Sequence, residues 1–394
     1  MSTWQERYSA SVMNTFGVPK LMLARGVGAH VWDTDGREYI DLLGGIAVNA
    51  LGHGHPALVN AVTEQLNTLG HVSNLFASQP QVALAERLVA LLGTDARVFF
   101  SNSGTEANEA AFKVTRRTGR TKIVATEDAF HGRTMGALAL TATEAYRTPF
   151  EPLPGDVVWV PFGDADALAA AVDDQTAAVI VEPVQGEAGV NVAPRDYLLR
   201  IREITQQHGA LMWLDEIQTG IGRTGTWFAH QNPALFDGDV VPDLITLAKG
   251  LGGGVPIGAT LATGAAAALL VPGNHGTTFG GNPLATAAAL AVLDTIEGDD
   301  LLTHAEEVGA LLRKGLAAEP RVTEVRGSGL MIGLTLADSV DTTKILDAAF
   351  AAGFIINVPR ASRIRLVPPL VLTVDDAEKF LAAFPAILDA AEAS

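Results

Sequence analysis

The stretch Leu244-Ile-Thr-Leu-Ala-Lys-Gly-Leu-Gly-Gly-Gly254 joins a short apolar run to a lone lysine and a glycine series. A run as apolar as Leu244–Ala248 is typical of a strand buried on both faces, as in a parallel sheet. A lysine at the end of such a strand is partly desolvated, which lowers its pKa and favours a nucleophilic amine. The glycines allow backbone to approach a flat ligand closely. Taken alone, however, Lys249 fits a solvated loop lysine better.

The same kind of apolar run recurs along the chain, each time ending in polar or glycine-rich sequence. The other runs are Val98–Phe100, Ile123–Ala125, Val157–Val160, Ala177–Val181 and Leu211–Leu214. Amphipathic stretches between them predict helices over Asn108–Thr118 and Pro194–His208, with Pro194 in the first turn of the second helix. Strands that alternate with helices indicate an α/β layer architecture.

The two ends of the chain differ from this middle part. A length of 394 residues suggests two domains, because about 150 residues per domain is usual. Ala29–Trp32 and Arg363–Val367 predict short strands among turns and amphipathic helices. We expect both ends to form one smaller lobe, with residues 1–45 and 291–394 in that lobe and residues 46–290 in a large domain.

Composition excludes several classes of function. The formal net charge of −17 repels phosphate backbones and anionic lipid, so we expect neither nucleic acid nor membrane as a partner. There is no cysteine, which excludes disulfides and thiolate metal sites, and His53-Gly-His55 fits a turn better than a metal site. Met1–Phe16 lacks an apolar signal core, and no run approaches the roughly 20 apolar residues of a membrane span. We therefore expect a cytoplasmic protein without a metal.

Polar residues follow several of the predicted strands, where ligands of open α/β sheets collect. Asp215 comes directly after one strand, and its carboxylate suits a metal, a base or a bound cation, or simply a strand-end cap. Glu182 and Glu187 follow another strand. Ser103-Gly-Thr105 precedes the helix expected from Asn108, and hydroxyls and amides at a helix N-terminus suit either a phosphate site or an ordinary helix cap.

One further motif supplies an aromatic ring and a guanidinium. In Phe130-His-Gly-Arg133, the Phe130 ring suits stacking on a flat ligand, and Arg133 suits a carboxylate held by two hydrogen bonds. A packed phenylalanine and a surface arginine remain the alternatives for this motif alone.

The ordered set of motifs resembles the class-III (subgroup II, ornithine-type) aminotransferases, which have the fold type I of pyridoxal-phosphate (PLP) enzymes. The set comprises residues 101–109, 130–133, 182–187, 215–225, 247–254 and 276–283. The resemblance extends from about Asp33 to Arg365. It implies a large domain with a mostly parallel seven-stranded sheet between helices, plus a smaller α+β lobe.

The resemblance also implies roles for single residues in binding pyridoxal 5′-phosphate. Lys249 is expected to hold the cofactor as a Schiff base and to move a proton, and Asp215 to pair with the pyridine nitrogen, which makes the ring an electron sink. The remaining cofactor contacts are expected from Ser103, Gly104 and Thr105 at the phosphate, Phe130 on the ring face and Gln218 near the ring oxygen. Thr278 is expected to reach the cofactor phosphate of a second subunit, which implies a homodimer with active sites at its interface. The alternative for Thr278 is the N-cap of a helix over Leu284–Ile296.

Within this family, Leu42–Asn49 and Ser73–Phe76 look like the branch that acts on N2-acetylornithine. Ornithine-specific members usually carry a tyrosine in the first stretch, to meet the free α-amino group. Gly45, Ile46 and Ala47 offer no such hydroxyl, and their apolar wall suits a neutral acetamido group.

The resemblance gives a scheme for two unlike substrates. Arg133 is expected to hold the distant carboxylate of both N2-acetylornithine and glutamate or 2-oxoglutarate. Arg365 resembles the arginine that holds the near carboxylate of glutamate, and Glu187 the residue that pairs with it when that carboxylate is absent. An unpaired buried guanidinium is costly, so it requires such an alternating partner. A fixed ion pair between lobes is the alternative, and Thr277 is expected to touch the substrate from the other subunit.

Other functions remain open at this stage. Ornithine, succinylornithine, succinyldiaminopimelate and 4-aminobutyrate are alternative amino donors. An aminomutase or a decarboxylase on the same fold is a more distant possibility. A PLP-binding regulatory domain fits less well, because this acidic chain has no spare segment for a basic DNA-binding module.

Overall fold

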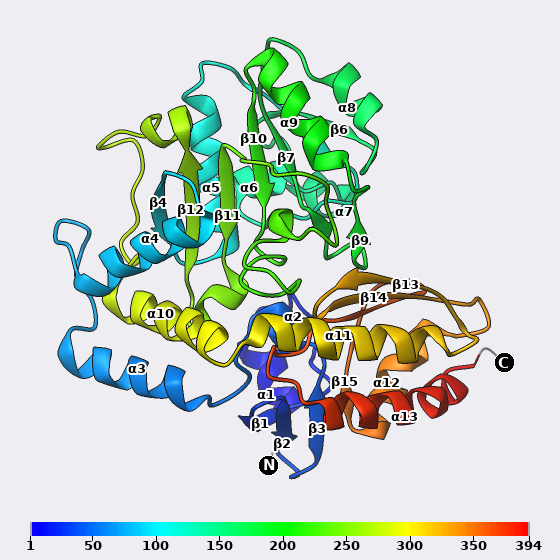
Figure 1. The fold of residues 1–394 in the computed structure, drawn as a ribbon. Helices are drawn as coiled ribbons and strands as arrows, with labels where there is room; N and C mark the ends of the chain where they lie inside the picture. The colour runs from blue at the N-terminus through cyan, green and yellow to red at the C-terminus, as the bar shows by residue number, and fades with distance from the viewer. Residues whose placement is uncertain (1, 393–394) are drawn as a thin grey trace.

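The computed structural model describes residues 2–392, and its centre is a seven-stranded sheet between helices (Figure 1). The strand order is β4-β12-β11-β10-β7-β5-β6. The bounds are β4 Ala96–Ser101, β5 Lys122–Thr126, β6 Asp156–Val160, β7 Thr176–Val181, β10 Leu211–Asp215, β11 Leu244–Leu247 and β12 Gly258–Thr263. All six strands expected from the apolar runs are present, and their ends agree with the expected ones to within two residues.

The strand that the sequence reasoning missed is β12. It runs antiparallel to both β11 and β4, whereas the neighbours from β11 to β6 are parallel. Its six residues, Gly258 to Thr263, are all buried. Apart from Leu261 it consists of glycine, alanine and threonine, so it has no strong hydrophobic signal.

Two helices begin at other residues than expected. Helix α5 spans Gly104–Arg116 and so begins four residues before Asn108. Its N-cap is Ser103, whose side chain accepts a hydrogen bond from the Glu106 amide. Helix α9 spans Tyr197–His208, so Pro194 lies before the helix and not in its first turn. The other helices around the sheet are α6 Met135–Leu140, α7 Glu144–Arg147 and α8 Ala165–Ala171.

A helical arm lies at the left of Figure 1 and is made of α3 Pro56–Thr68, α4 Gln79–Leu92 and α10 Pro283–Gly298. The N-cap of α10 is Asn282, whose side chain accepts from the Ala285 amide. The alternative that Thr278 caps this helix is therefore wrong. No helix within residues 2–392 is long and apolar enough to cross a membrane.

The smaller lobe contains strands from both ends of the chain. One sheet has the order β1-β2-β3-β15 and another β13-β14-β17-β16. β15 pairs in parallel with β3, through Phe354 with Ile40 and Ile355 with Asp41. Both ends of the chain therefore share one sheet, while the exact division into residues 1–45, 46–290 and 291–394 stays a prediction. The strands are β1 Leu23–Val27, β2 His30–Asp33, β3 Glu38–Asp41, β13 Val322–Ser328, β14 Met331–Leu336, β15 Phe354–Ile355, β16 Asn357–Arg360 and β17 Arg363–Leu366.

The remaining elements cover or connect these layers. Helices α11 Leu301–Ala317, α12 Thr342–Ala352 and α13 Val374–Ala390 belong to the smaller lobe, and α1 Trp4–Ser11 and α2 Gly44–Ala47 lie near the N-terminal strands (Figure 1). Short pieces are β8 Val184–Gln185, β9 Asn191–Val192 and the 3-10 turns Thr148–Phe150, Ala229–Gln231, Lys249–Gly252 and Gly264–Ala268.

Candidate active site

Most of the residues singled out from the sequence line one cavity of about 420 Å³ at the carboxyl ends of the parallel strands. The loops after β4, β5, β7, β10 and β11 all reach it. Its lining includes Ser103, Gly104, Thr105, Phe130, Arg133, Glu187, Asp215, Gln218 and Lys249. The volume lies within the usual range for small-molecule sites.

Lys249 is held in an uncommon backbone conformation directly after β11. Its φ of +40° is in the left-handed region, which costs a non-glycine residue about 1–3 kcal/mol. Burial lowers the pKa of Lys249, while the charge of Glu187 opposes this effect and that of Arg365 adds to it. The residue thus meets the expectation of a desolvated amine.

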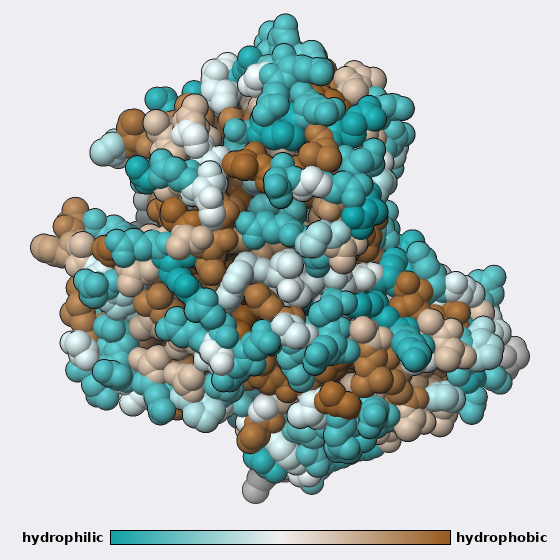
Figure 2. Space-filling view, viewed as in Figure 1, coloured by the Kyte–Doolittle hydropathy of each residue, from teal (hydrophilic) through white to brown (hydrophobic). Residues whose placement is uncertain are grey.

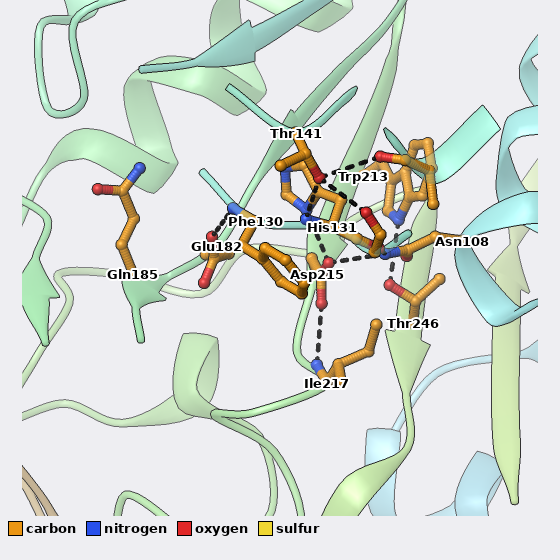
Figure 3. Close-up of polar contacts among 12 residues, drawn as sticks. Asn108, Phe130, His131, Thr141, Glu182, Gln185, Trp213, Asp215, Ile217 and Thr246 are labelled. Atoms are coloured by element: carbon orange, nitrogen blue, oxygen red, sulfur yellow. Dashed lines mark hydrogen bonds and ion pairs between the residues drawn. The ribbon is translucent and has the colours of Figure 1, made fainter. Parts of the chain in front are cut away.

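Asp215 ends β10, the strand beside β11, and its carboxylate is almost fully buried (Figure 3). Its Oδ2 accepts hydrogen bonds from His131 Nδ1 at 2.7 Å and from Asn108 Nδ2 at 2.9 Å. Its Oδ1 accepts from the Ile217 amide at 3.0 Å. These three donors hold the carboxylate in one orientation. An anion with a fixed direction suits a cationic ring nitrogen.

Sequence reasoning gave no role to three residues of this network: Asn108, His131 and Glu182. Asn108 Nδ2 also donates to the His131 carbonyl oxygen at 2.6 Å, so it links the helix α5 to the loop of the Phe130 motif. Buried Asn108 Oδ1 and His131 Nε2 have no partner among the described residues. His131 belongs to the Phe130-His-Gly-Arg133 motif, which was identified from the sequence. Its contact with Asp215 was not predictable, because only the fold shows that the loop after β5 lies beside the end of β10.

Glu182 lies beside Asp215 in the same cavity, and Figure 3 shows its bond to the Phe130 backbone. It accepts from the amides of Phe130 at 3.0 Å and Gly186 at 3.1 Å. Burial raises the pKa of Glu182 to about 7, against the opposing charge of His131. The two amides fix the loops that carry the ring of Phe130 and Glu187.

The turn Ser103-Gly-Thr105 forms the anion-binding end of the cavity. Ser103 caps only the Glu106 amide, and no described residue accepts from the first two amides of α5, those of Gly104 and Thr105. A Cβ on Gly104 would lie 2.8 Å from Ile217 Cγ2, so a larger residue at this position would require the Ile217 side chain to move.

Arg365, on β17 of the smaller lobe, is fully buried and pairs with Glu187 of the large domain. Its Nη1 donates to Glu187 Oε1 at 2.6 Å and to Gln218 Oε1 at 3.1 Å, and Asn357 accepts from its Nε and Nη2. Desolvation raises the pKa of Glu187, but the charges of Arg365 and Lys249 outweigh it and lower the pKa overall. This carboxylate is therefore ionised near neutral pH.

Arg133 faces a second, larger cavity of about 1070 Å³, which shares Phe130, Arg133, Glu187 and Lys249 with the first. No described residue forms an ion pair or a hydrogen bond with its side chain. Gly45 and Ile46 also line this cavity. Ala47, expected beside them, is buried in the core.

Three expected residues do not line either cavity of this single chain: Arg365, which is linked to the cavities through its pair with Glu187, and Thr277 and Thr278. Thr278 is exposed, and Thr277 Oγ1 accepts from Asn102 Nδ2 at 3.2 Å. Neither contacts Lys249 or Asp215 of the same subunit, so their expected roles depend on a second subunit.

The sequence pattern of the class-III aminotransferases matches residues 12–388. The chain belongs to this family. A class-III relative, the acetylornithine aminotransferase of Mycolicibacterium smegmatis, is 59% identical over 392 residues, which are 99% of each chain. The acetylornithine aminotransferase of Streptomyces coelicolor is 56% identical over 98% of this chain and 95% of its own.

Solved structures of class-III enzymes agree with the fold. The N-acetylornithine aminotransferase of Stenotrophomonas maltophilia has a TM-score of 0.82 and 38% identity, covering 98% of this chain and 99% of its own. The ornithine aminotransferase of Toxoplasma gondii, solved with partial PLP occupancy, has a TM-score of 0.92 and 31% identity, covering 98% and 94%. The protein is a fold type I, PLP-dependent aminotransferase.

The residues of the cavity fit PLP. The free amides of Gly104 and Thr105 suit its phosphate, the buried Asp215 carboxylate suits a protonated ring nitrogen, and Lys249 offers the amine for its aldehyde. Unpaired amides and an oriented carboxylate in the same cavity as the lysine are features that an ordinary helix cap or strand end does not need.

Proposed function

We propose that this aminotransferase transfers the terminal amino group of N2-acetylornithine to 2-oxoglutarate, in arginine biosynthesis in the cytoplasm. The observation that carries the proposal is the unequal state of two arginines: Arg365 is paired with Glu187, while Arg133 has no ion-pair or hydrogen-bond partner among the described residues. Relatives that are 56–59% identical and named for acetylornithine support the choice of substrate.

The proposed roles of the cofactor-binding residues follow from their positions. Lys249 holds the cofactor and Asp215 its ring nitrogen, Phe130 covers the ring, Gln218 lies near the ring oxygen, and Ser103, Gly104 and Thr105 bind the phosphate. When bound, PLP supplies an electron sink and carries the amino group between the two substrates. Lys249 Nζ, favoured as a free amine by burial, accepts a proton from the substrate carbon that bears the amine.

The two arginines bind different carboxylates of the two substrates. N2-acetylornithine reacts at its terminal amine, so its only carboxylate is distant and binds Arg133 while Glu187 keeps Arg365 neutralised. Glutamate brings a second carboxylate next to the reacting carbon, which replaces Glu187 at Arg365 in a two-pronged hydrogen bond. Breaking a buried pair without a substitute costs about 3–5 kcal/mol, so Arg365 always needs one of its two partners.

The wall of the larger cavity suits the acetamido group. Gly45 and Ile46 present no hydroxyl or charge there, and Phe16 and Pro359 lie in the same lining. Gly45 and Ile46 themselves offer a free ammonium no side-chain acceptor, so ornithine should be the poorer donor.

A homodimer is proposed as the working unit. Large apolar residues are exposed in the segment between α3 and α4, where Leu75 is 87% and Phe76 69% accessible, and Figure 2 shows apolar atoms at this left edge. Asn74 Nδ2 donates to the carbonyl oxygens of Thr277 and Gly280, which ties this segment to Thr278. An exposed apolar group of this kind marks an interface. A partner docked there would receive Thr277 and Thr278 at its active site.

The test is a panel of amino donors with 2-oxoglutarate as acceptor. We expect N2-acetylornithine to have the highest kcat/KM, well above ornithine, N2-succinylornithine, succinyldiaminopimelate and 4-aminobutyrate. A higher value for any of the other four would assign that substrate instead. Turnover without dependence on 2-oxoglutarate would contradict aminotransfer to this acceptor.

A further inference from the structure

Tyr146 covers the guanidinium of Arg133. The Arg133 Cζ atom lies 3.5 Å from the centroid of the Tyr146 ring and 5.6 Å from that of Phe130. Both rings line the larger cavity together with Arg133. Tyr146 belongs to the short helix α7, outside every motif that carried the family resemblance.

Stacking on a ring leaves the edge of a guanidinium free. A cation over a ring face is attracted by the ring quadrupole, while the five N–H groups lie in the plane of the guanidinium and point past the ring. In this chain that attraction is what holds Arg133, because no described residue accepts a hydrogen bond from its side chain. Arg133 can therefore present a two-pronged donor to a carboxylate without first leaving a protein partner.

A backbone hydrogen bond joins the segment that leads to Tyr146 to the loop that carries Arg133. The Ala142 amide donates to the Ala129 carbonyl oxygen at 2.9 Å, which joins the approach to α7 to the loop of Phe130. At the other end of α7, the Arg147 guanidinium lies 4.1 Å from the centroid of the Trp159 ring on β6. The ring of Tyr146 is thus fixed relative to the loop that carries Arg133.

We propose that Tyr146 is a positioning residue that sets the affinity of the site for the distal carboxylate of both substrates. It acts through Arg133 and does not touch the reacting atoms. A long arginine side chain on an exposed loop samples many rotamers, and ordering them on binding reduces affinity. Tyr146 orders the side chain beforehand. This inference rests on the proposed role of Arg133.

The experiment measures the binding of glutarate, an unreactive dicarboxylate, to the holoenzyme by titration calorimetry. We expect Tyr146→Leu, which keeps bulk but removes the ring, to weaken binding about tenfold. Tyr146→Phe, which keeps the ring, should stay within about twofold of wild type. Phe150→Leu is the matched control, because it removes a ring from the adjoining turn that does not line the cavity of Arg133.

Two further readouts separate positioning from a structural role. Tyr146→Leu should raise KM for glutamate and for N2-acetylornithine by similar factors with little change in kcat, because the contact to the distal carboxylate is the same before and during the reaction. In an Arg133→Gln background the additional loss of glutarate binding on Tyr146→Leu should disappear.

Unchanged glutarate binding in Tyr146→Leu would overturn the proposal, as would an equal loss with and without Arg133. So would a failure of Tyr146→Phe to restore binding. These outcomes differ from a failure of the proposed function, which would show in wild-type enzyme as a preference for a donor other than N2-acetylornithine.

Discussion

At the scale of single residues, the chemistry depends on one amine in a strained backbone position. Because Lys249 is the only lysine lining either cavity of the described chain, borohydride treatment of the holoenzyme should fix the cofactor to it alone. We expect Lys249→Ala to lose the borohydride-trapped adduct, measured by mass spectrometry, and to lose activity by several orders of magnitude. A trapped adduct that persists in this variant would refute the assignment.

Arg365 serves only one of the two substrates in the proposed scheme. Arg365→Ala should therefore slow the half-reaction with glutamate by about 10²–10³-fold and that with N2-acetylornithine by less than about tenfold. Single-turnover absorbance changes of the cofactor measure the two half-reactions separately.

The control is Arg313→Ala, which breaks an ion pair with Glu306 away from both cavities, and it should affect neither half-reaction. Equal damage to both half-reactions in Arg365→Ala would favour a fixed ion pair between the lobes.

Glu182 should make the stability of the cofactor-free protein depend on pH. Its pKa is raised to about 7 in the folded chain, from 4.5 when unfolded, so the folded state holds the proton more tightly. The resulting stabilisation is complete below pH 4.5 and is lost as the pH rises to about 7. The shift corresponds to on the order of 3 kcal/mol.

Glu182→Gln, which is neutral at every pH, lacks this dependence. Urea unfolding between pH 5 and pH 7.5 should show wild type losing stability relative to the variant as the pH increases. A difference between the two proteins that stays constant over this range would contradict the raised pKa.

At the scale of elements, the cap of α5 has two tasks, since it starts the helix and aligns the amides of Gly104 and Thr105. Ser103→Ala should lower the free energy of unfolding by about 1 kcal/mol and also weaken the affinity for PLP. Asp341→Ala removes the corresponding cap of α12 in the smaller lobe, where the side chain accepts from the Thr343 amide.

The Asp341 variant should cost similar stability but leave PLP affinity unchanged. Thermal unfolding of the cofactor-free proteins and fluorescence titration with PLP measure the two quantities. An equal effect of both variants on PLP affinity would argue against a phosphate site at α5.

The elements also show what sequence reasoning could predict. Large apolar runs located six of the seven central strands, because burial on both faces selects such residues. β12 was not predicted, because Leu261 is its only large apolar residue and the others are glycine, alanine and threonine. The start of α5 was placed four residues late, because the capping role of Ser103 was weighed only as an alternative.

The sequence identified residues of the candidate site but not the contacts between them. Motifs identified Lys249, Asp215 and Arg133 through a family resemblance, and the parallel order of β10 and β11 brings the first two to one cavity. The bonds of Asn108 and His131 to Asp215 connect α5, the loop after β5 and β10, which are distant in sequence. Tyr146 belongs to no motif, so only the three-dimensional structure reveals it beside Arg133.

At the scale of the whole molecule, the proposed dimer predicts that assembly and activity are linked. Replacing the exposed Leu75 and Phe76 by aspartate buries two unpaired charges at the proposed interface, so the subunits should separate. We expect sedimentation to show monomers, and activity to fall with dimer content because Thr278 no longer reaches a neighbouring site.

Val374→Asp is the control, since Val374 is also exposed but lies on α13 in the smaller lobe. It should retain the assembly state of wild type. A fully active monomer in the double aspartate variant would contradict active sites shared between subunits.

The pairing of β3 with β15 has a consequence for synthesis on the ribosome. Residues 38–41 emerge early, but their partner strand at 354–355 emerges near the end of translation. At about 5–20 residues per second, the edge of β3 stays open for roughly 15–60 s. An open strand edge is a template for pairing with other chains, so we expect nascent polypeptides of this protein to require chaperones until residues 354–355 have left the exit tunnel.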